Sequence, residues 1–232
     1  MMVGMRLQKI MGITVVFALL TALAAGLSVL NSRNAAVGSP AWVMISRFLE
    51  VLIVGSFGLA VARESQIPGS LFIGFEDWSL TLRDIINYGV LPGLVLGLIN
   101  YFFFFTYRYS PNVVSQIRDM HSIYDSFLVS LGSVEEETLF RLFTLSCFLF
   151  SFRHLYSRLA RLWPGVVAIL PKALSVVLSS LLFAMAHTVD GFTAAFFGGI
   201  FLGLIYIQSG IESAIAAHFC ANFLFFSASY LS

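Results

Sequence analysis

The chain has 232 residues, of which 59% are hydrophobic and only 11% are charged, and its mean hydropathy is +0.91. Roughly a quarter of the residues of a soluble domain are charged, so this composition excludes an ordinary soluble protein. The formal net charge of +1 and the lack of a basic cluster give no indication of nucleic-acid binding. The chain is therefore predicted to be an integral membrane protein.

Apolar segments long enough to cross a bilayer follow one another along the whole chain. A transmembrane helix needs about 20 predominantly apolar residues. The candidate segments lie near residues 10–30, 43–62, 85–107, 127–152, 165–187, 191–209 and 211–231. We therefore expect an all-α fold, a polytopic transmembrane helical bundle of about seven spans, with six to eight as the range.

The first apolar segment is expected to remain as a span. It is too long for the apolar region of a signal peptide, and no A-x-A-like site followed by a soluble region is present. The two cysteines, Cys147 and Cys220, fall inside predicted spans and indicate no disulfide framework. Two of the four histidines, His121 and His154, lie in expected loops.

Four ionisable side chains interrupt the apolar segment 127–152, which reads FLVSLGSVEEETLFRLFTLSCFLFSF. An ionised group near the bilayer centre costs about 2.5–3.5 kcal/mol, so these groups should face protein or a water-filled cavity. Glu137 and Arg141 have the spacing and order of an ion pair on one helix face, which a purely structural salt bridge explains equally well. Glu136 points about 100° away from Glu137, so its spacing does not pair it with Arg141 and it is free for a different role. Glu135 lies further round, where it can reach an interface or another helix.

Two further polar pairs lie in the spans that follow. In SSLLFAMAHTVDG, His187 ends an apolar helix and Phe183 lies one turn earlier on the same face. In AAHFCANFLFF, His218 and Asn222 are also one turn apart and should point together into the bundle. A single intramembrane histidine more often makes a hydrogen bond between helices. Polar groups on three separate helices instead favour a shared cavity.

These residues resemble the three motifs of the CPBP intramembrane proteases, a family that includes the type II CaaX-prenyl endopeptidases. The motifs occur in order on separate hydrophobic helices, and they are EE-x-x-x-R (Glu136, Glu137, Arg141), F-x-x-x-H (Phe183, His187) and H-x-x-x-N (His218, Asn222). The resemblance implies a catalytic four-helix region over 127–232, preceded by a transmembrane region of about three spans over 1–126. Family members commonly have glycine after the motif arginine, whereas Leu142 follows Arg141 here, which affects the expected packing of that helix.

The resemblance implies a catalytic role for four of the motif residues. In the family, the first glutamate and the histidine of the second motif, here Glu136 and His187, are thought to hold and deprotonate the attacking water. His218 and Asn222 would donate hydrogen bonds to the developing oxyanion, a role worth about 10²–10³ in rate per donor. The expected activity is therefore hydrolysis of a peptide bond by a glutamate-activated water.

The remaining motif residues, Glu137, Arg141 and Phe183, would orient the site or bind the substrate. No metal or other cofactor is expected from the resemblance. Zinc is the alternative, since two histidines and a glutamate are an acceptable zinc set. Asparagine in the fourth position suits an oxyanion donor better than a zinc ligand.

The resemblance also implies the partners and the location of the protein. The expected substrates are peptides or lipidated proteins, either prenylated CaaX-type or otherwise membrane-associated, with the lipid bilayer as a further partner and no nucleic acid. The chain should be a multi-pass protein of a bacterial cytoplasmic membrane or of an endomembrane such as the ER.

The same residues also bear on other functions. The strings H-E-x-x-H, G-x-S-G and G-x-G-D of other intramembrane proteases are absent from the sequence. The non-enzymatic alternatives are an ion- or proton-coupled transporter and a non-catalytic membrane scaffold, because intramembrane glutamates and histidines also serve in proton relays.

Overall fold

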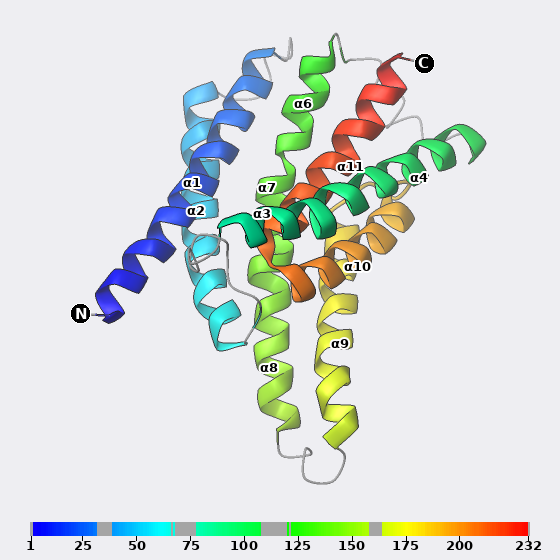
Figure 1. Ribbon diagram of the computed structural model, residues 1–232. Coiled ribbons are helices and arrows are strands. Elements are labelled where there is room, and N and C mark those ends of the chain that lie inside the picture. Colours follow the sequence, from blue (N-terminus) through cyan, green and yellow to red (C-terminus); the bar gives the residue numbers. More distant parts are fainter. Residues whose placement is uncertain are drawn as a thin grey trace.

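The structure is a computed structural model that describes residues 2–31, 39–65, 67, 78–107, 120, 122–157 and 164–231. Within these ranges the regular structure is entirely helical (Figure 1). The helices are α1 (Met2–Asn31), α2 (Pro40–Glu64), α3 (Trp78–Ile85), the π-helix η2 (Ile86–Val90), α4 (Leu91–Tyr107), α6 (Ile123–Leu131), α7 (Ser133–Glu137), the π-helix η3 (Thr138–Leu145), α8 (Ser146–Tyr156), α9 (Pro164–Met185), α10 (Phe192–Ser209) and α11 (Ile211–Leu231).

Several of these helices follow one another directly, so the described part of the chain forms seven helical runs that coincide with the seven apolar segments. The third run joins α3, η2 and α4, and the fourth joins α6, α7, η3 and α8. The predicted all-α bundle of about seven spans is thereby confirmed. The prediction that His154 lies in a loop is wrong, because this residue lies in the last turn of α8. His121 lies outside the described residues.

Four helices are long and apolar enough to cross a membrane in the described part of the chain. They are Pro40–Glu64, Leu82–Phe103, Phe192–Ser209 and Ile211–Leu231, and shorter apolar helices cover Thr14–Leu27 and Ile169–Met185. The fourth run, residues 123–156, also has the length of a span, but its three glutamates and its arginines lower its hydropathy. The chain is an integral membrane protein.

The helices before and after residue 126 pack on one another in a single bundle. α2 packs against η3 and α8, while α11 packs against α4, α6, α7 and α10. In Figure 1, α2, α6, α8 and α9 run upright, and α4 and α10 lie inclined across the middle of the bundle. The division of the chain into regions 1–126 and 127–232 stays a prediction.

Leu142, which takes the place of the family's usual glycine, packs against a glycine of α2. Its side chain is 1% exposed. A Cβ atom added at Gly58 would lie 2.8 Å from the carbonyl oxygen of Leu142, so only glycine allows this approach. One turn earlier, a Cβ atom at Gly55 would lie 3.2 Å from Cγ2 of Thr138. The space for Leu142 is therefore provided by the partner helix.

Glycines at every fourth position hold η2 and α4 close against α11. The contacting pairs are Gly89 with Ser213, Gly93 with Ala217 and Gly97 with Ala221. A Cβ atom at Gly97 would lie 2.8 Å from the carbonyl oxygen of Ala221, so the two backbones nearly touch. Because the residue numbers rise together along both helices, η2 and α4 run parallel to α11. This contact places α4 beside the helix that carries His218 and Asn222.

Candidate active site

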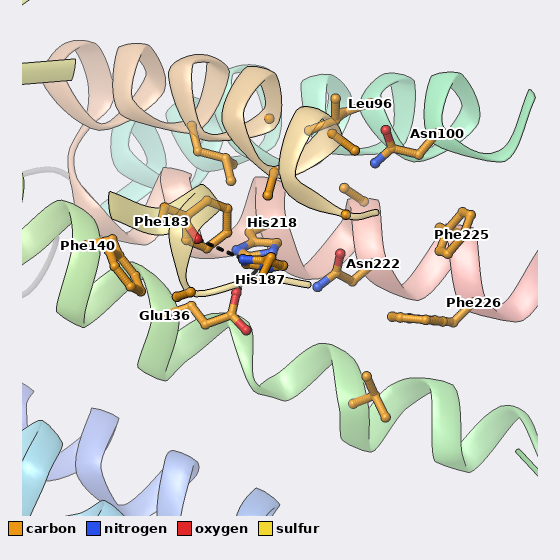
Figure 2. Close-up of a pocket in the computed structure, with 18 of the residues that line it drawn as sticks. Leu96, Asn100, Glu136, Phe140, Phe183, His187, His218, Asn222, Phe225 and Phe226 are labelled. Carbon is orange, nitrogen blue, oxygen red and sulfur yellow. Dashed lines mark hydrogen bonds and ion pairs between the residues drawn. The ribbon is translucent and has the colours of Figure 1, made fainter. Parts of the chain in front are cut away.

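A pocket of about 500 Å³ lies between the helices and collects polar residues from several of them (Figure 2). Its polar lining residues are Asn100, Glu136, His187, Thr188, His218 and Asn222. The rest of its wall is apolar or aromatic, with Phe140 and Phe183 near the glutamate and Phe225 and Phe226 toward the other end of the view in Figure 2. The predicted convergence on one pocket is observed for Glu136, His187, His218 and Asn222, and their catalytic roles stay predictions.

Glu136 is the carboxylate that faces the pocket. Its side chain is 38% exposed, whereas that of the neighbouring Glu137 is 0% exposed. The Oε2 atom of Glu136 lies 3.6 Å from Nε2 of His218 and has no hydrogen-bond partner among the described residues. A separation of 3.6 Å is too long for a direct hydrogen bond. This oxygen is itself buried, so the remainder of the partly exposed side chain meets the pocket, and there the carboxylate can bind a water molecule or a substrate atom.

Glu137 is buried and contacts two basic side chains. Its Oε1 atom accepts a hydrogen bond from Nδ1 of His218 at 2.8 Å, and its Oε2 atom lies 3.4 Å from Nε of Arg141. The Arg141 side chain is also 0% exposed, and its Cζ atom lies 4.6 Å from the centroid of the Phe183 ring. The ring face attracts the guanidinium cation. The predicted ion pair between Glu137 and Arg141 is thus present, and Glu137 also contacts His218.

The helix that carries both glutamates changes from α to π directly after them. α7 ends at Glu137, and η3 begins at Thr138. Within this segment the hydroxyl of Thr144 donates to the carbonyl of Leu139, five residues earlier, at 2.8 Å. The π-helix is rare, and short π segments occur frequently at functional sites. The wider turn changes the direction of Arg141 relative to an ideal α-helix.

His187 lies just beyond the end of α9 and is oriented by that helix. Its Nδ1 atom lies 2.8 Å from the carbonyl oxygen of Phe183, the contact drawn as a dashed line in Figure 2. A carbonyl oxygen only accepts, so the hydrogen bond assigns a proton to Nδ1. The ring is exposed, and its centroid lies 4.5 Å from that of Phe183. In the neutral ring, Nε2 then carries a lone pair that can accept a hydrogen bond from water.

His218 links the two glutamates from α11 and is only 7% exposed. Its Nδ1–H group donates to Glu137, and its Nε2 atom faces Glu136. If His218 carries a second proton, its charge and that of Arg141 balance the two carboxylates. Buried charges are tolerated when they are paired in this way. The imidazolium form also turns Nε2 into a hydrogen-bond donor.

Two asparagine side chains complete the polar lining. Asn222 follows His218 by one turn of α11, as the motif predicts, and both line the pocket. Asn100 reaches the same pocket from α4 and was not among the predicted site residues. The sequence held a signal for it, since Asn100 is a polar residue in an apolar helix three positions after Gly97 of the glycine repeat.

Glu135 does not belong to the pocket. Its Oε1 atom lies 2.6 Å from Nη1 of Arg47 on α2, and the same nitrogen lies 2.8 Å from Oε2 of Glu50. Of the two predicted positions for Glu135, contact with another helix is the one observed. The three consecutive glutamates therefore have three different surroundings.

The zinc alternative would use Glu136, His187 and His218 as ligands, and it stays a prediction. In the described ranges, no three His, Cys, Asp or Glu side chains are grouped so that they could hold a metal ion. His187 and His218 each use Nδ1 in a hydrogen bond to the protein, to Phe183 and Glu137 respectively, which is also the usual second contact of a histidine that binds a metal through Nε2. The expectation that no cofactor is needed stays a prediction.

Comparison with known families supports the resemblance seen in the motifs. Residues 125–224 match the family model described as Type II CAAX prenyl endopeptidase Rce1-like. The match covers less than half of the 232 residues and includes all three motifs. Neither a curated protein nor a solved structure matches the chain. The expected resemblance is confirmed, and it supports an intramembrane protease in general.

Proposed function

We propose that this protein is an intramembrane endopeptidase that hydrolyses a peptide bond with a water molecule activated by Glu136. One observation carries the proposal. Glu136 and Glu137 contact opposite nitrogens of His218, yet Glu136 is 38% exposed in the pocket and Glu137 is 0% exposed. Adjacent acids in such different surroundings are suited to different roles in one reaction.

Glu136 acts first as a general base. Its carboxylate, which lines the pocket, accepts a proton from the attacking water. His187 holds the same water through Nε2, because its Nδ1 proton is committed to the Phe183 carbonyl. The water oxygen attacks the scissile carbonyl carbon, and the carbonyl oxygen takes up the negative charge.

His218 and Asn222 stabilise that oxyanion. The Nε2–H group of the protonated His218 and the amide N–H of Asn222 lie one turn apart on α11 and line the same pocket. Each donor of this kind is worth about 10²–10³ in rate. When the C–N bond breaks, Glu136 passes its proton to the leaving amine, which returns the carboxylate to its starting form.

Glu137, Arg141 and Phe183 position the reacting groups without touching the substrate carbonyl. Glu137 fixes the His218 ring through the 2.8 Å hydrogen bond to Nδ1. Arg141 neutralises Glu137 and packs on the face of Phe183. Phe183 in turn supplies the carbonyl oxygen that orients His187. The three residues therefore hold both histidines in place.

The proposed substrates are prenylated CaaX-type peptides or other membrane-associated peptides. The description of the matched family names such endopeptidases. The pocket has the volume of a small-molecule site and an apolar and aromatic wall, which suits a lipid group beside a peptide. Unmodified membrane peptides are the second class, because the same wall also accepts apolar side chains.

The test is peptide cleavage by the purified protein in lipid nanodiscs. A farnesylated CaaX-type peptide and its unmodified counterpart are compared, and Glu136→Gln serves as the blank. We expect the wild type to cleave the farnesylated peptide at least about 10³ times faster than Glu136→Gln. Equal rates for the wild type and Glu136→Gln on both peptides would contradict the proposal and favour the non-enzymatic alternatives.

A further inference from the structure

Asn100 is a polar residue of the pocket that the proposed reaction does not use. It lies in α4, whose sequence LPGLVLGLINYFFFFTY is otherwise strongly apolar. The side chain is half-buried and lines the same pocket as Glu136 and His218. Its amide makes no hydrogen bond among the described residues, and an unpaired amide in an apolar surrounding costs free energy. A ligand in the pocket would satisfy it.

The packing of α4 fixes where this amide lies relative to the proposed catalytic residues. Gly97 contacts Ala221, and the helices run parallel, so Asn100 lies at the level of residue 224 of α11. That level is roughly 9 Å further along α11 than His218. In Figure 2, Asn100 lies toward the end of the pocket where Phe225 is found, away from Glu136.

The distance matches the spacing of an extended peptide. An extended chain rises about 3.3 Å per residue, so roughly 9 Å corresponds to about three residues. A peptide whose scissile carbonyl lies beside His218 therefore presents a main-chain amide to Asn100 about three residues away. An asparagine side chain offers both an acceptor oxygen and two N–H donors, which is the complement of a peptide group.

We propose that Asn100 anchors a subsite for the substrate main chain, about three residues from the scissile bond. This subsite rests on the proposed function. Asn100 is a positioning residue, because it binds a peptide group that does not react. An extended peptide inside a membrane has main-chain groups that water does not reach, and Asn100 pairs with one of them. The subsite thereby sets the register of the peptide against Glu136.

The experiment combines variants of Asn100 with peptides in which one main-chain amide is replaced by an ester. Asn100→Leu removes the polar group while it keeps the approximate size, and Asn100→Gln restores an amide. Leu96→Ala, one turn earlier on the same pocket wall, is the matched control for a change of shape. In the farnesylated CaaX-type peptide, each main-chain amide that lies within four positions of the scissile bond is replaced by an ester in turn.

We expect Asn100→Leu to raise KM roughly fivefold to tenfold with little change in kcat, and Asn100→Gln to recover part of this loss. The ester about three positions from the scissile bond should raise the KM of the wild type by a similar factor. The same ester should not raise the KM of Asn100→Leu any further, because this variant has already lost the interaction. Leu96→Ala should respond to this ester as the wild type does. The affinity of the uncleaved peptide for Glu136→Gln, with and without Asn100→Leu, should change by the same factor as KM.

Three results separate this subsite from the proposed function. If the wild type cleaves the peptide and Asn100→Leu leaves KM and affinity unchanged, the subsite is wrong and the protease stands. The subsite is also wrong if Asn100→Leu lowers the rate equally on every ester peptide, since that is the pattern of a purely structural change. If nothing is cleaved while Asn100→Leu still weakens peptide binding selectively, the subsite stands and the proposed function fails.

Discussion

Glu136 and Glu137, neighbours in the sequence, lie against opposite nitrogens of one imidazole ring. Oε1 of Glu137 lies 2.8 Å from Nδ1 of His218, and Oε2 of Glu136 lies 3.6 Å from Nε2 of the same ring. The contact between Glu137 and His218 is buried, whereas the contact between Glu136 and His218 borders the pocket. In the proposed mechanism Glu137 positions His218 and Glu136 transfers the proton, and the following experiments address this difference.

Glu137→Gln should lower stability and activity together. The change leaves Arg141 buried without its carboxylate, and an uncompensated buried charge costs about 3–5 kcal/mol. The measurement is thermal stability in detergent alongside peptide cleavage. The double variant Glu137→Gln/Arg141→Gln should recover part of the stability, because it removes the orphaned charge. Adding Arg141→Gln to Glu136→Gln should recover no thermal stability. Equal recovery of stability in the Glu137→Gln and Glu136→Gln variants would contradict the pairing of Arg141 with Glu137.

His187 and His218 should respond differently to removal. His187 is exposed and, among the described residues, its one hydrogen bond is to the Phe183 carbonyl, so His187→Ala should reduce the cleavage rate about 10²–10⁴-fold while thermal stability stays the same. His218→Ala should lose activity and several degrees of thermal stability, because Glu137 loses a buried partner. His154→Ala, in the last turn of α8, is the control and should change neither quantity. A stability loss in His187→Ala equal to that in His218→Ala would contradict these assignments.

Metal chelation should leave the activity nearly intact. A glutamate that takes the proton from water directly needs no ion to activate it. The cleavage rate measured after dialysis against 1,10-phenanthroline should stay within about twofold of the untreated rate. Loss of activity that zinc restores, and that calcium does not, would replace the proposed mechanism with a metal-dependent one.

Gly198 should set the size of the group that the pocket accepts. A Cβ atom added there meets no atom within 4 Å, and the residue lines the pocket. Gly198→Leu should therefore fold normally and lower kcat/KM for the farnesylated peptide roughly tenfold more than for the unmodified one. Gly199→Leu is the contrasting change, because a Cβ atom there already lies 3.0 Å from Ser180, and it should lower stability. Equal losses on both peptides would show that Gly198 does not select for size.

Much of this arrangement follows from local sequence patterns. The seven apolar segments were sufficient to predict the helical runs, because a hydrophobic segment of span length has few alternatives to a helix in a bilayer. The four-residue spacing of Glu137 and Arg141 predicted their ion pair, and the same spacing placed Asn222 beside His218. These features depend on a single helix, so its periodicity is sufficient to predict them.

The remaining features depend on contacts between distant segments. No periodicity shows that His218 meets both glutamates from α11, or that α4 brings Asn100 to the same pocket. The glycines at 89, 93 and 97 indicate a close helix contact but not which helix is the partner. The π-helix η3 was also beyond prediction, because it differs from an α-helix by only a small change in hydrogen bonding.

The central claim is tested most directly by single-turnover cleavage and peptide affinity for Glu136→Gln and Glu137→Gln, measured together with thermal stability. Glutamine keeps the size of the side chain at position 136, and Glu136 is partly exposed, so this variant should fold and bind the peptide as the wild type does. Its cleavage rate should fall at least about 10³-fold, as for a group that acts in the transition state. If Glu136→Gln keeps the wild-type rate while Glu137→Gln folds normally and is inactive, Glu137 is the base and the assignment of the two glutamates is reversed.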